Sequence, residues 1–412
     1  MNANRSMTLI SAAIVIAVAG SSGTASAGID GSGITKPKFT KGAVHRFGSI
    51  YVNGVRYNTD KALFIIDGAL GSESDLAVGQ VVSVLGTVNA DGNSGTAYLV
   101  TFEDIVDGPI SSLDVDMNRL TVMGQTVLVN ADTVIDVSGA GSAIEHLDVD
   151  DVVEVSGFVD SHGRIVAASV RAGSSSGEYD LAGTIESVDV DAMRLTVNGL
   201  PVDFHAAGIF GLDAEVPRVG DAVEIVGGGF DEAGAFVASR IYGGNTGLAA
   251  ISGVEAELEG LITGFHSLNE FDLGGTRVRL TWNTRYVNDW IFGLSTDRKV
   301  QVSGSMDASG TLVAEQVVFE KLAEEALAGT VDAISGDYLV VGSRLVRVMP
   351  ETKYTDDSDA DVRQFSVGSL ELGDAVEIRG HGSADVLHAT VLQRVDDEDG
   401  EDDDDDDESD DD

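Results

Sequence analysis

The chain has 412 residues, no cysteine and a formal net charge of −44. The absence of cysteine excludes a disulfide scaffold, a thiolate zinc site, an iron–sulfur protein and a cysteine nucleophile. The acidity disfavours binding to nucleic acids and to anionic lipid surfaces, because a negative surface repels phosphate groups. Glycine is frequent, at 50 residues, and proline is scarce, at 5, which indicates short strands joined by tight turns.

Residues 1–27 have the pattern of a secretory signal peptide. Arg5 supplies a positive charge, the apolar run TLISAAIVIAVA begins at Thr8, and residues 25–27 (Ala-Ser-Ala) form a small-residue cleavage site. The apolar run is too short to span a bilayer as a helix, and a retained membrane anchor is the alternative interpretation. The sequence therefore predicts an exported protein without a membrane span, in the periplasm or at the cell surface, with a linker at 28–41.

Five segments of the chain open in the same way, with a glycine near the start of an alternating apolar strand. These opening glycines are Gly42, Gly108, Gly183, Gly260 and Gly329. Each copy carries a later segment such as VGDAVEI, with a glycine two positions beyond it, at Gly86, Gly157, Gly227, Gly304 and Gly380. We therefore expect repeats at 42–106, 107–177, 178–247, 248–321 and 322–395.

Apolar residues alternate with polar ones inside each repeat, which is typical of half-buried strands. In the third repeat, Leu195 and Val197 share one face while Thr196 points away. The pattern predicts five strands per repeat, with a helical or looped crossing between the third and fourth strands at 209–218. Five such strands favour a small OB-like barrel. The fold class is thus all-β, a tandem array of five OB-like five-stranded barrels, and five small sandwich-like modules are the alternative.

Four repeats carry an Asn/Asp-x-x-Gly turn near their end, at Asn89–Gly92, Asp160–Gly163, Asp231–Gly234 and Asp307–Gly310. This spacing predicts a hairpin loop whose glycine has a positive φ, where a Cβ is unfavourable. The fifth repeat has HGSADV from His381 instead, so its loop should differ.

The repeat openings, the VNGVRY phrase at 52–57 with the preceding RFGSI, the SESDLAVGQVVSVLGTVNADG run at 72–92 and the export signal together resemble an uncharacterised bacterial family. Its members are exported proteins with tandem OB-like domains of unknown function. The resemblance covers roughly residues 42–395, is closest in the first repeat and is weakest in the fourth. It implies the OB-like fold and an exported location, and it carries no catalytic residues.

The motifs of common enzymes are missing from the sequence. The seven histidines form no H-x-H or H-E-x-x-H pair and are interpreted as scattered, and there is no G-x-S-x-G elbow and no phosphate-binding loop. The phrases DVDMN from Asp114 and DVD from Asp189 mimic the start of a calcium-binding loop. Arg119 and Arg194 stand where that loop needs glycine, so both phrases are interpreted as turns. We therefore predict a non-enzymatic protein without a resident cofactor.

An acidic tail covers residues 396–412 and should be disordered, because it contains almost no apolar residues to bury. Closely spaced carboxylates favour weak, multidentate Ca²⁺ binding, and the alternative is a solvated tail that only keeps the protein soluble. The candidate ligands are Asp402, Asp403, Asp404, Asp405, Asp406 and Asp407.

The fourth repeat holds both tryptophans of the chain, within a short segment rich in aromatic and basic residues. The rings either fill the barrel and its contact with the next repeat, or form a platform for a glycan, as aromatic rings do in other OB-like barrels. The candidate ligand-binding residues are Trp282, Tyr286, Trp290, Phe292, Arg277 and Arg279, with Arg285 nearby.

These patterns predict a monomeric array that acts as a binding or structural module. Five similar units in a row would each make a weak contact, and the array would raise the effective concentration of the rest. The expected partner is an envelope protein or a glycan, with cation association through the tail. One alternative is a glycan-binding protein with its site in the fourth repeat, and the least favoured is a hydrolase with a site between repeats.

Overall fold

The computed structural model describes residues 36–137, 143–173, 177–212, 216–243, 253–383 and 385–396. The predicted signal peptide and the candidate tail ligands lie outside the described residues. The described chain consists of β-strands and four short 3₁₀ turns, with no α-helix, which confirms the all-β prediction. Within it, no helix has the length and apolar character needed to cross a bilayer.

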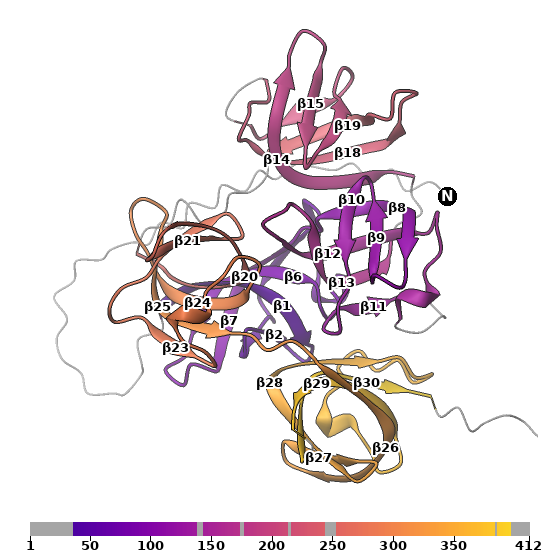
Figure 1. The fold of residues 1–412 in the computed structure, drawn as a ribbon, viewed down its shortest axis with the longest axis vertical. Helices are drawn as coiled ribbons and strands as arrows, with labels where there is room; N and C mark the ends of the chain where they lie inside the picture. The colour runs from indigo at the N-terminus through magenta and orange to yellow at the C-terminus, as the bar shows by residue number, and fades with distance from the viewer. Residues whose placement is uncertain are drawn as a thin grey trace, which may run out of the picture. The chain divides into compact units, whose positions relative to one another are not determined.

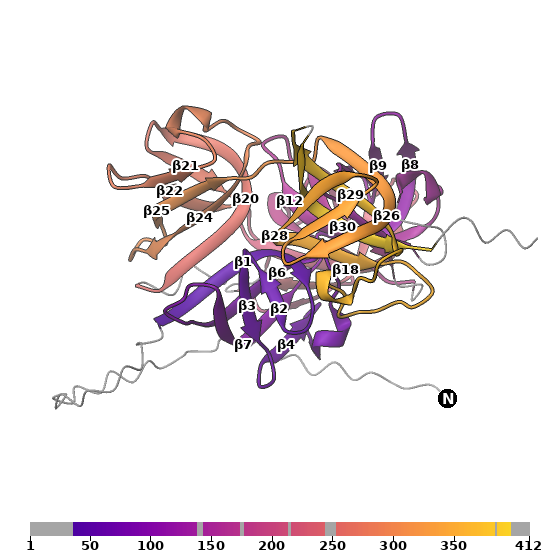
Figure 2. The same ribbon diagram turned by 90° about the horizontal axis from the view of Figure 1, so that it is seen from below.

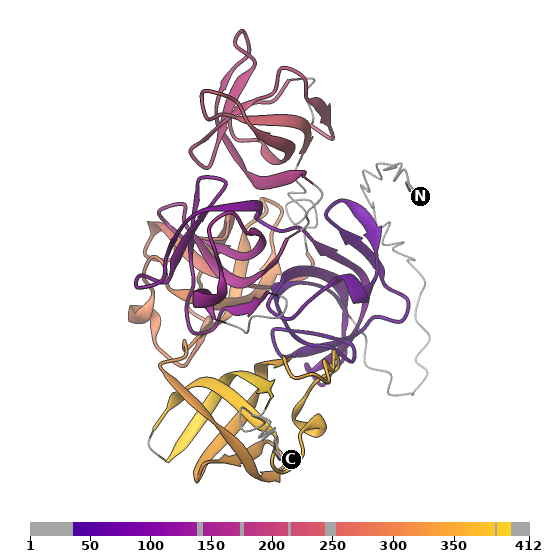
Figure 3. The same cartoon turned by 90° about the vertical axis from the view of Figure 1, so that its right-hand side faces the viewer.

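The fifth repeat shows the topology of the units most directly (Figure 1 and Figure 3). Its strands are β26 (Glu325–Ser335), β27 (Tyr338–Val341), β28 (Arg344–Asp356), β29 (Ala375–Gly382) and β30 (Val386–Val395), with the 3₁₀ turn η4 (Val367–Ser369). They close into a barrel in the order β26-β27-β28-β30-β29, and only the β28–β30 pair is parallel. This is the strand order of an OB-type barrel, so the predicted barrel is confirmed over the sandwich.

The first four repeats follow the same order, with a third strand that is broken into two parts. Repeat 1 contains β1 (Lys36–Arg46), β2 (Ile50–Val52), β3 (Val55–Asn58), β4 (Leu63–Ile66), β5 (Ala69–Gly71), η1 (Glu73–Asp75), β6 (Val81–Val88) and β7 (Ser94–Phe102). Repeat 2 contains β8 (Val106–Asp114), β9 (Arg119–Val122), β10 (Gln125–Leu128), β11 (Val134–Asp136), η2 (Ile144–His146), β12 (Val152–Val159) and β13 (Ile165–Ala172). Repeat 3 contains β14 (Tyr179–Asp189), β15 (Arg194–Val197), β16 (Leu200–Asp203), β17 (Gly208–Phe210), β18 (Ala222–Phe230) and β19 (Phe236–Gly243). Repeat 4 contains β20 (Glu255–Ser267), β21 (Glu270–Leu273), β22 (Thr276–Arg279), β23 (Arg285–Val287), η3 (Ile291–Gly293), β24 (Lys299–Met306) and β25 (Leu312–Phe319).

Two details of the strand limits differ from the sequence-based expectation. β1 starts at Lys36, inside the segment expected to be a linker at 28–41. The crossing expected as a helix or loop at 209–218 begins with the strand β17, which pairs in parallel with β19. Both differences arise because backbone pairing continues past the point where the apolar alternation of the sequence stops.

Two different structural constraints favour glycine at these repeat positions: close approach of two strands and a positive φ. A Cβ on Gly304 would lie 2.1 Å from the carbonyl oxygen of Val313, and one on Gly380 would lie 2.2 Å from that of His388. At both places the ladder contains a bulge that brings the fourth and fifth strands together. The turn glycines Gly92, Gly163, Gly234 and Gly310 have φ values of 74°, 77°, 81° and 78°, which confirms the predicted left-handed turns.

The described residues up to Lys321 form one compact unit, and those from Leu322 onward form a second one that contains repeat 5. Within the first unit, strands of different barrels pair with each other. β1 pairs in parallel with β20 from Lys38↔Glu255 to Lys41↔Leu258, as Figure 1 and Figure 2 show. β8 pairs with β14 at Asp107↔Asp180 and Val106↔Leu181. Repeats 1 and 4 therefore form one 13-stranded sheet and repeats 2 and 3 one 12-stranded sheet, a pairing between repeats that the sequence did not predict.

The cores follow the predicted alternation. Leu195 and Val197 are both buried in the third barrel, as their shared face predicts. A separate apolar cluster lies where repeats 1, 2 and 4 meet, and it consists of Ala43, Val81, Phe158, Ala168 and Leu261. The first unit is therefore held together by apolar packing between barrels as well as by strand pairing between them.

Candidate binding surface

Three of the four predicted aromatic residues of repeat 4 project into solvent. The exposed fractions are 93% for Trp282, 76% for Trp290 and 96% for Phe292. The interpretation that these rings fill the barrel is therefore wrong for these three. Leaving a large ring in water forgoes the roughly 1.5–3 kcal/mol that burial of such a side chain contributes, so these three rings add little to the stability of the barrel.

The other predicted site residues have structural partners. Tyr286 is half-buried and its ring stacks on Phe319 at the edge of the core, with 6.5 Å between ring centroids; burial raises the pKa of Tyr286. Arg279 Nε donates to Glu270 Oε1 at 2.7 Å, and its Nη1 donates to Asp307 Oδ2 at 3.1 Å. The structure thus places Tyr286 in the packing of the barrel and Arg279 in an ion-pair network.

Arg277 belongs to a polar group on the outer face of the first three strands of repeat 4. Its Nη2 lies 2.9 Å from His266 Nε2, which is 2.5 Å from Asp272 Oδ2. Asp272 also pairs with the Arg277 guanidinium. Arg277 and Arg279 are therefore both neutralised by carboxylates of the same barrel and do not form a free anion-binding pair.

Trp282 lies in a turn whose hydrogen bonds recur in repeats 2 and 5. The backbone N–H of Thr281 donates to Thr284 Oγ1 at 2.8 Å, and that hydroxyl donates to the carbonyl of Ala314 at 2.8 Å. Equivalent threonine-anchored turns occur at Asn130–Thr133 and Met349–Thr352. In the other repeats the position of Trp282 is filled by Asp60, Ala131, His205 and Pro350. The turn therefore forms without a tryptophan at this position.

Trp290 and Phe292 lie in a second ordered loop, around η3. Asn288 has a φ of 70° and its Nδ2 donates to the carbonyl of Phe319 at 3.1 Å, while Asp289 Oδ1 accepts from the N–H of Trp290 at 2.8 Å. In repeats 1, 2 and 5 the position of Trp290 is filled by Ser72, Ala143 and Ser366, and that of Phe292 by Ser74, Glu145 and Gly368. β23 separates the two loops and is only three residues long, or about 10 Å. We call Trp282, Trp290 and Phe292 the aromatic group of repeat 4.

Repeat 2 carries a groove of about 640 Å³ on the outer face of its first three strands, the face that OB-fold proteins use for ligands. Its polar lining consists of Ser112, Asp114, Asp116, Arg119, Thr121 and Thr126. Ser112 Oγ donates to Thr121 Oγ1 at 2.9 Å, and Arg119 pairs with Asp114 at 3.0 Å. The phrase from Asp114 is a turn, as predicted, with Asn118 at a φ of 47°, but the groove beside it was not predicted.

Carboxylates from repeats 1, 2 and 3 approach one another inside the first unit. Burial, together with the nearby acids Glu154 and Asp180, raises the pKa of Asp67 to about 8, and burial beside Asp180 raises that of Glu224 to about 8. The carboxylate oxygens of Asp104, Asp107 and Asp180 lie within 4.8 Å of one another. Such an oxygen set suits Ca²⁺ or Mg²⁺. Acidic residues are too frequent in this sequence for these to be distinguished before folding.

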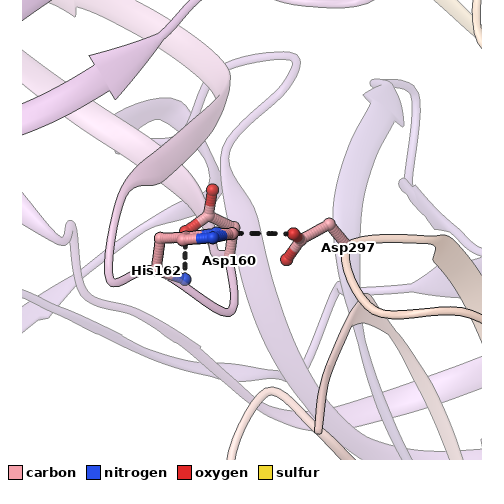
Figure 4. A group of neighbouring side chains, drawn as sticks. All are labelled: Asp160, His162 and Asp297. Carbon is pink, nitrogen blue, oxygen red and sulfur yellow. Dashed lines mark hydrogen bonds and ion pairs between the residues drawn. The ribbon is translucent and has the colours of Figure 1, made fainter.

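Two histidine arrangements were also missed by the interpretation of scattered histidines. His381 and His388 lie opposite each other in the β29–β30 hairpin, with ring centroids 5.6 Å apart. His162 lies beside Asp160 of its own turn and Asp297 of repeat 4 (Figure 4). Hairpin register could have revealed the first pair, whereas the second depends on contact between barrels.

The comparisons with known proteins agree with the repeats. Five segments match the family described as Domain of unknown function (DUF5666), at residues 41–98, 107–171, 182–242, 259–318 and 328–392. No curated protein matches the chain. Among solved structures, the chain is similar to one titled "drosophila Unr CSD456", at 16% identity and a TM-score of 0.15, covering 53% of this chain and 98% of that one. That overlap is too poor to support any conclusion. The chain belongs to the DUF5666 family and contains five copies of its domain in tandem.

Proposed function

We propose that the chain is a non-enzymatic binding protein that works outside the cytoplasm and contacts a glycan through the aromatic group of repeat 4. The observation that carries the proposal is the exposure of Trp282, Trp290 and Phe292 in ordered loops whose counterparts in sister repeats hold small or polar residues. A fold that forms equally well without these rings gives no structural reason to keep them. Exposed apolar groups of this kind mark interaction sites.

The chemistry of these residues suits a saccharide. Indole and phenyl rings are flat and rigid, so they stack on the apolar face of a ring ligand at a small cost in conformational entropy. Both loops are held by hydrogen bonds to the barrel, which pre-organises the rings. Arg277 and Arg279 are neutralised by carboxylates, and the net charge is strongly negative. The favoured ligand is therefore a neutral or amino-bearing glycan rather than an anionic polymer.

Other parts of the chain would add to this contact. The groove of repeat 2 presents hydroxyl, carboxylate and guanidinium groups that can hydrogen-bond to sugar hydroxyls. A polymeric glycan that touches both repeats would gain affinity through effective concentration. Export follows in this proposal from the pattern of residues 1–27.

The test is tryptophan fluorescence of the full chain, titrated with a panel of cell-wall and capsular glycans. Each variant takes the residue of a sister repeat at the same position, as in Trp282→Ala and Trp290→Ser, so the loops should still fold. We expect a shift of tryptophan emission with a binding glycan, and an affinity about tenfold weaker for each ring removed, as for stacking of bases on aromatic rings. Leu268→Ala is the matched control, since Leu268 is exposed on the same barrel and is not aromatic. A flat response across the panel, or equal binding by the Trp290→Ser variant in calorimetry, would refute the proposal.

The acidic tail at 396–412 is the basis of a second, separable part of the proposal. It would associate weakly with Ca²⁺, because adjacent carboxylates repel and a divalent ion relieves that repulsion. Calorimetry with CaCl₂ should give larger heats for the full chain than for a chain that ends at Val395. Identical heats would leave the tail with no role in cation association.

A further inference from the structure

We propose that Asp160, His162 and Asp297 form a site for a divalent transition-metal ion, such as Zn²⁺, that links repeats 2 and 4. Asp160 and His162 belong to the turn between β12 and β13, and Asp297 lies in the loop before β24. Figure 4 shows the three side chains converging from the two repeats. One ligand atom from each residue lies within 4.8 Å of the other two.

The spacing of two of these atoms leaves room for a metal ion. His162 Nδ1 lies 3.6 Å from Asp297 Oδ2, which is beyond the range of a good hydrogen bond, and its contact with Ser161 Oγ at 3.2 Å is one that an ion would replace. Two ligands on a tetrahedral zinc ion, with bonds of about 2.0–2.1 Å, are separated by about 3.3–3.4 Å. A metal ion therefore fits between the imidazole and the carboxylate after an adjustment of a few tenths of an ångström.

Hydrogen bonds hold both halves of the site in place. Asp160 Oδ1 accepts from the backbone N–H groups of His162 and Arg164, at 2.8 and 2.9 Å, which fixes the turn. Asp297 has a φ of 64°, and its carboxylate accepts from Ser161 N–H at 2.7 Å and from Ser161 Oγ at 2.9 Å. The ligand residues are thus positioned before any ion binds, which lowers the cost of binding.

The charges at the site also suit a cation. Asp160 accepts hydrogen bonds from the Arg164 side chain and from the backbone N–H groups of His162 and Arg164. Arg164 pairs with the Asp160 carboxylate at 2.7 Å, and as an outer partner of the metal it would orient Asp160 as a ligand. Asp297 remains to offset the charge of the ion. One imidazole and two carboxylates form a nitrogen and oxygen donor set that binds Zn²⁺, Co²⁺ or Mn²⁺.

The sister turns show that His162 is not required for folding. The same Asp-x-x-Gly turn occurs in repeats 3 and 4, where Ala233 and Ser309 occupy the position of His162. In those turns Asp231 and Asp307 accept the same backbone hydrogen bonds. His162 is 68% exposed at its side chain, so the site is open to ions from solvent. The turn therefore does not need the imidazole for its own folding, and in repeat 2 the imidazole faces Asp297.

The test is a Co²⁺ titration of the full chain, in excess Ca²⁺ to occupy simple carboxylate sites. We expect one equivalent of Co²⁺ with visible absorption of a low-coordinate, imidazole-bound ion, and displacement of that ion by Zn²⁺. His162→Ala should weaken binding at least tenfold while it leaves the Ser161–Asp297 hydrogen bonds in place. His205→Ala is the matched control, because His205 is also exposed in a turn, and it should bind as the unmodified chain does.

A second measurement tests whether the bound ion stabilises the folded chain. Zn²⁺ should raise the melting temperature of the unmodified chain and of His205→Ala, because an ion that binds only the folded state stabilises it, and it should leave that of His162→Ala unchanged. No visible absorption with Co²⁺, or equal affinity of the His162→Ala variant, would overturn the proposal. Neither result depends on glycan binding by repeat 4.

Discussion

Lys299 lies at the junction of three barrels, and its replacement tests how that junction is held. Its Nζ lies 2.5 Å from Glu259 Oε1 and 2.9 Å from Glu320 Oε2, and it lies over the Phe158 ring of repeat 2. Glu259 is only 3% exposed, and its other oxygen accepts from the N–H of Ala43 in repeat 1 at 2.9 Å. Lys299→Met would leave this buried carboxylate without its main partner.

The expected loss of stability is about 3–5 kcal/mol, the usual cost of removing one partner of a buried ion pair. The structure gives a consistent figure. Although burial acts to raise it, Lys299, His45 and the Ala43 N–H lower the pKa of Glu259 to about 2 from an ordinary 4.5. That difference corresponds to roughly 3 kcal/mol of preference for the ionised form. Lys299→Met combined with Glu259→Gln should recover most of the loss, because no charge is then buried alone.

The pH dependence of the variant follows from the same pair. In the unmodified chain, the depressed pKa of Glu259 contributes stability that is present above about pH 4.5 and lost as the pH falls toward 2. In Lys299→Met the burial of Glu259 is no longer offset by the ammonium group, so its pKa should rise instead. The variant should therefore regain more stability than the unmodified chain does as the pH falls from 7 to 5, because the unmodified pair adds nothing over that range.

Differential scanning calorimetry measures these effects directly. The first unit should melt roughly 5–10 °C lower in Lys299→Met, while repeat 5, a separate compact unit, provides an unchanged reference transition. Arg119→Met is the control, because the Arg119–Asp114 pair is exposed at both side chains and should contribute less than about 1 kcal/mol. A loss for Lys299→Met as small as that of the control, or no recovery at pH 5, would refute the reasoning.

Three further predictions concern other parts of the chain. Burial raises the pKa of Asp67 and Glu224 to about 8, so the folded state favours the protonated form of both side chains. The melting temperature should therefore fall as the pH rises from 5 to 8, and Asp67→Asn should make that fall smaller in scanning fluorimetry. Thr352→Val should cost repeat 5 about 1–3 kcal/mol in urea unfolding, since its buried hydroxyl bonds two backbone groups at 2.7 Å. Gly304→Ala should lower the melting temperature far more than Gly264→Ala, which has no atom within 4 Å of the added Cβ.

Each of these predictions has a clear contradicting result. A melting temperature that stays constant or rises between pH 5 and pH 8 would show that the buried carboxylates are solvated. Unchanged urea midpoints for the threonine variant would show that water replaces its hydrogen bonds. Equal melting temperatures for the two glycine variants would show that the strands at the bulge can separate at little cost.

The barrel could be predicted from the sequence because its signals are local. Leu195 and Val197 alternate with polar residues, and Gly310 follows Asp307 at the spacing of a left-handed turn. Short segments of the sequence therefore predict their own backbone conformation. The extent of β1 and the strand β17 were missed because pairing there is not marked by side-chain alternation.

The candidate site could be located but not interpreted from the sequence. Trp282 and Trp290 stand out as rare residues, yet their exposure depends on which face of the loop meets the barrel. The contacts between barrels were beyond prediction for a different reason. Glu259 is fixed by the N–H of Ala43, which is 216 residues away, and no pattern within one repeat indicates which distant repeat it will meet.

The parallel ladder between β1 and β20 has a consequence for the order in which the chain matures. One edge of β1 pairs with β6 of the same repeat, but the opposite edge at Lys38–Lys41 is paired only when Glu255–Leu258 are in place. The latter are synthesised after three complete repeats. Until then, the earliest barrel presents an unsatisfied strand edge, the kind of surface that recruits a strand from a neighbouring molecule. Nascent chains that stall before repeat 4 should therefore be the forms most prone to mispairing, and a gene that loses repeat 4 should lose solubility before it loses the fold of any single barrel.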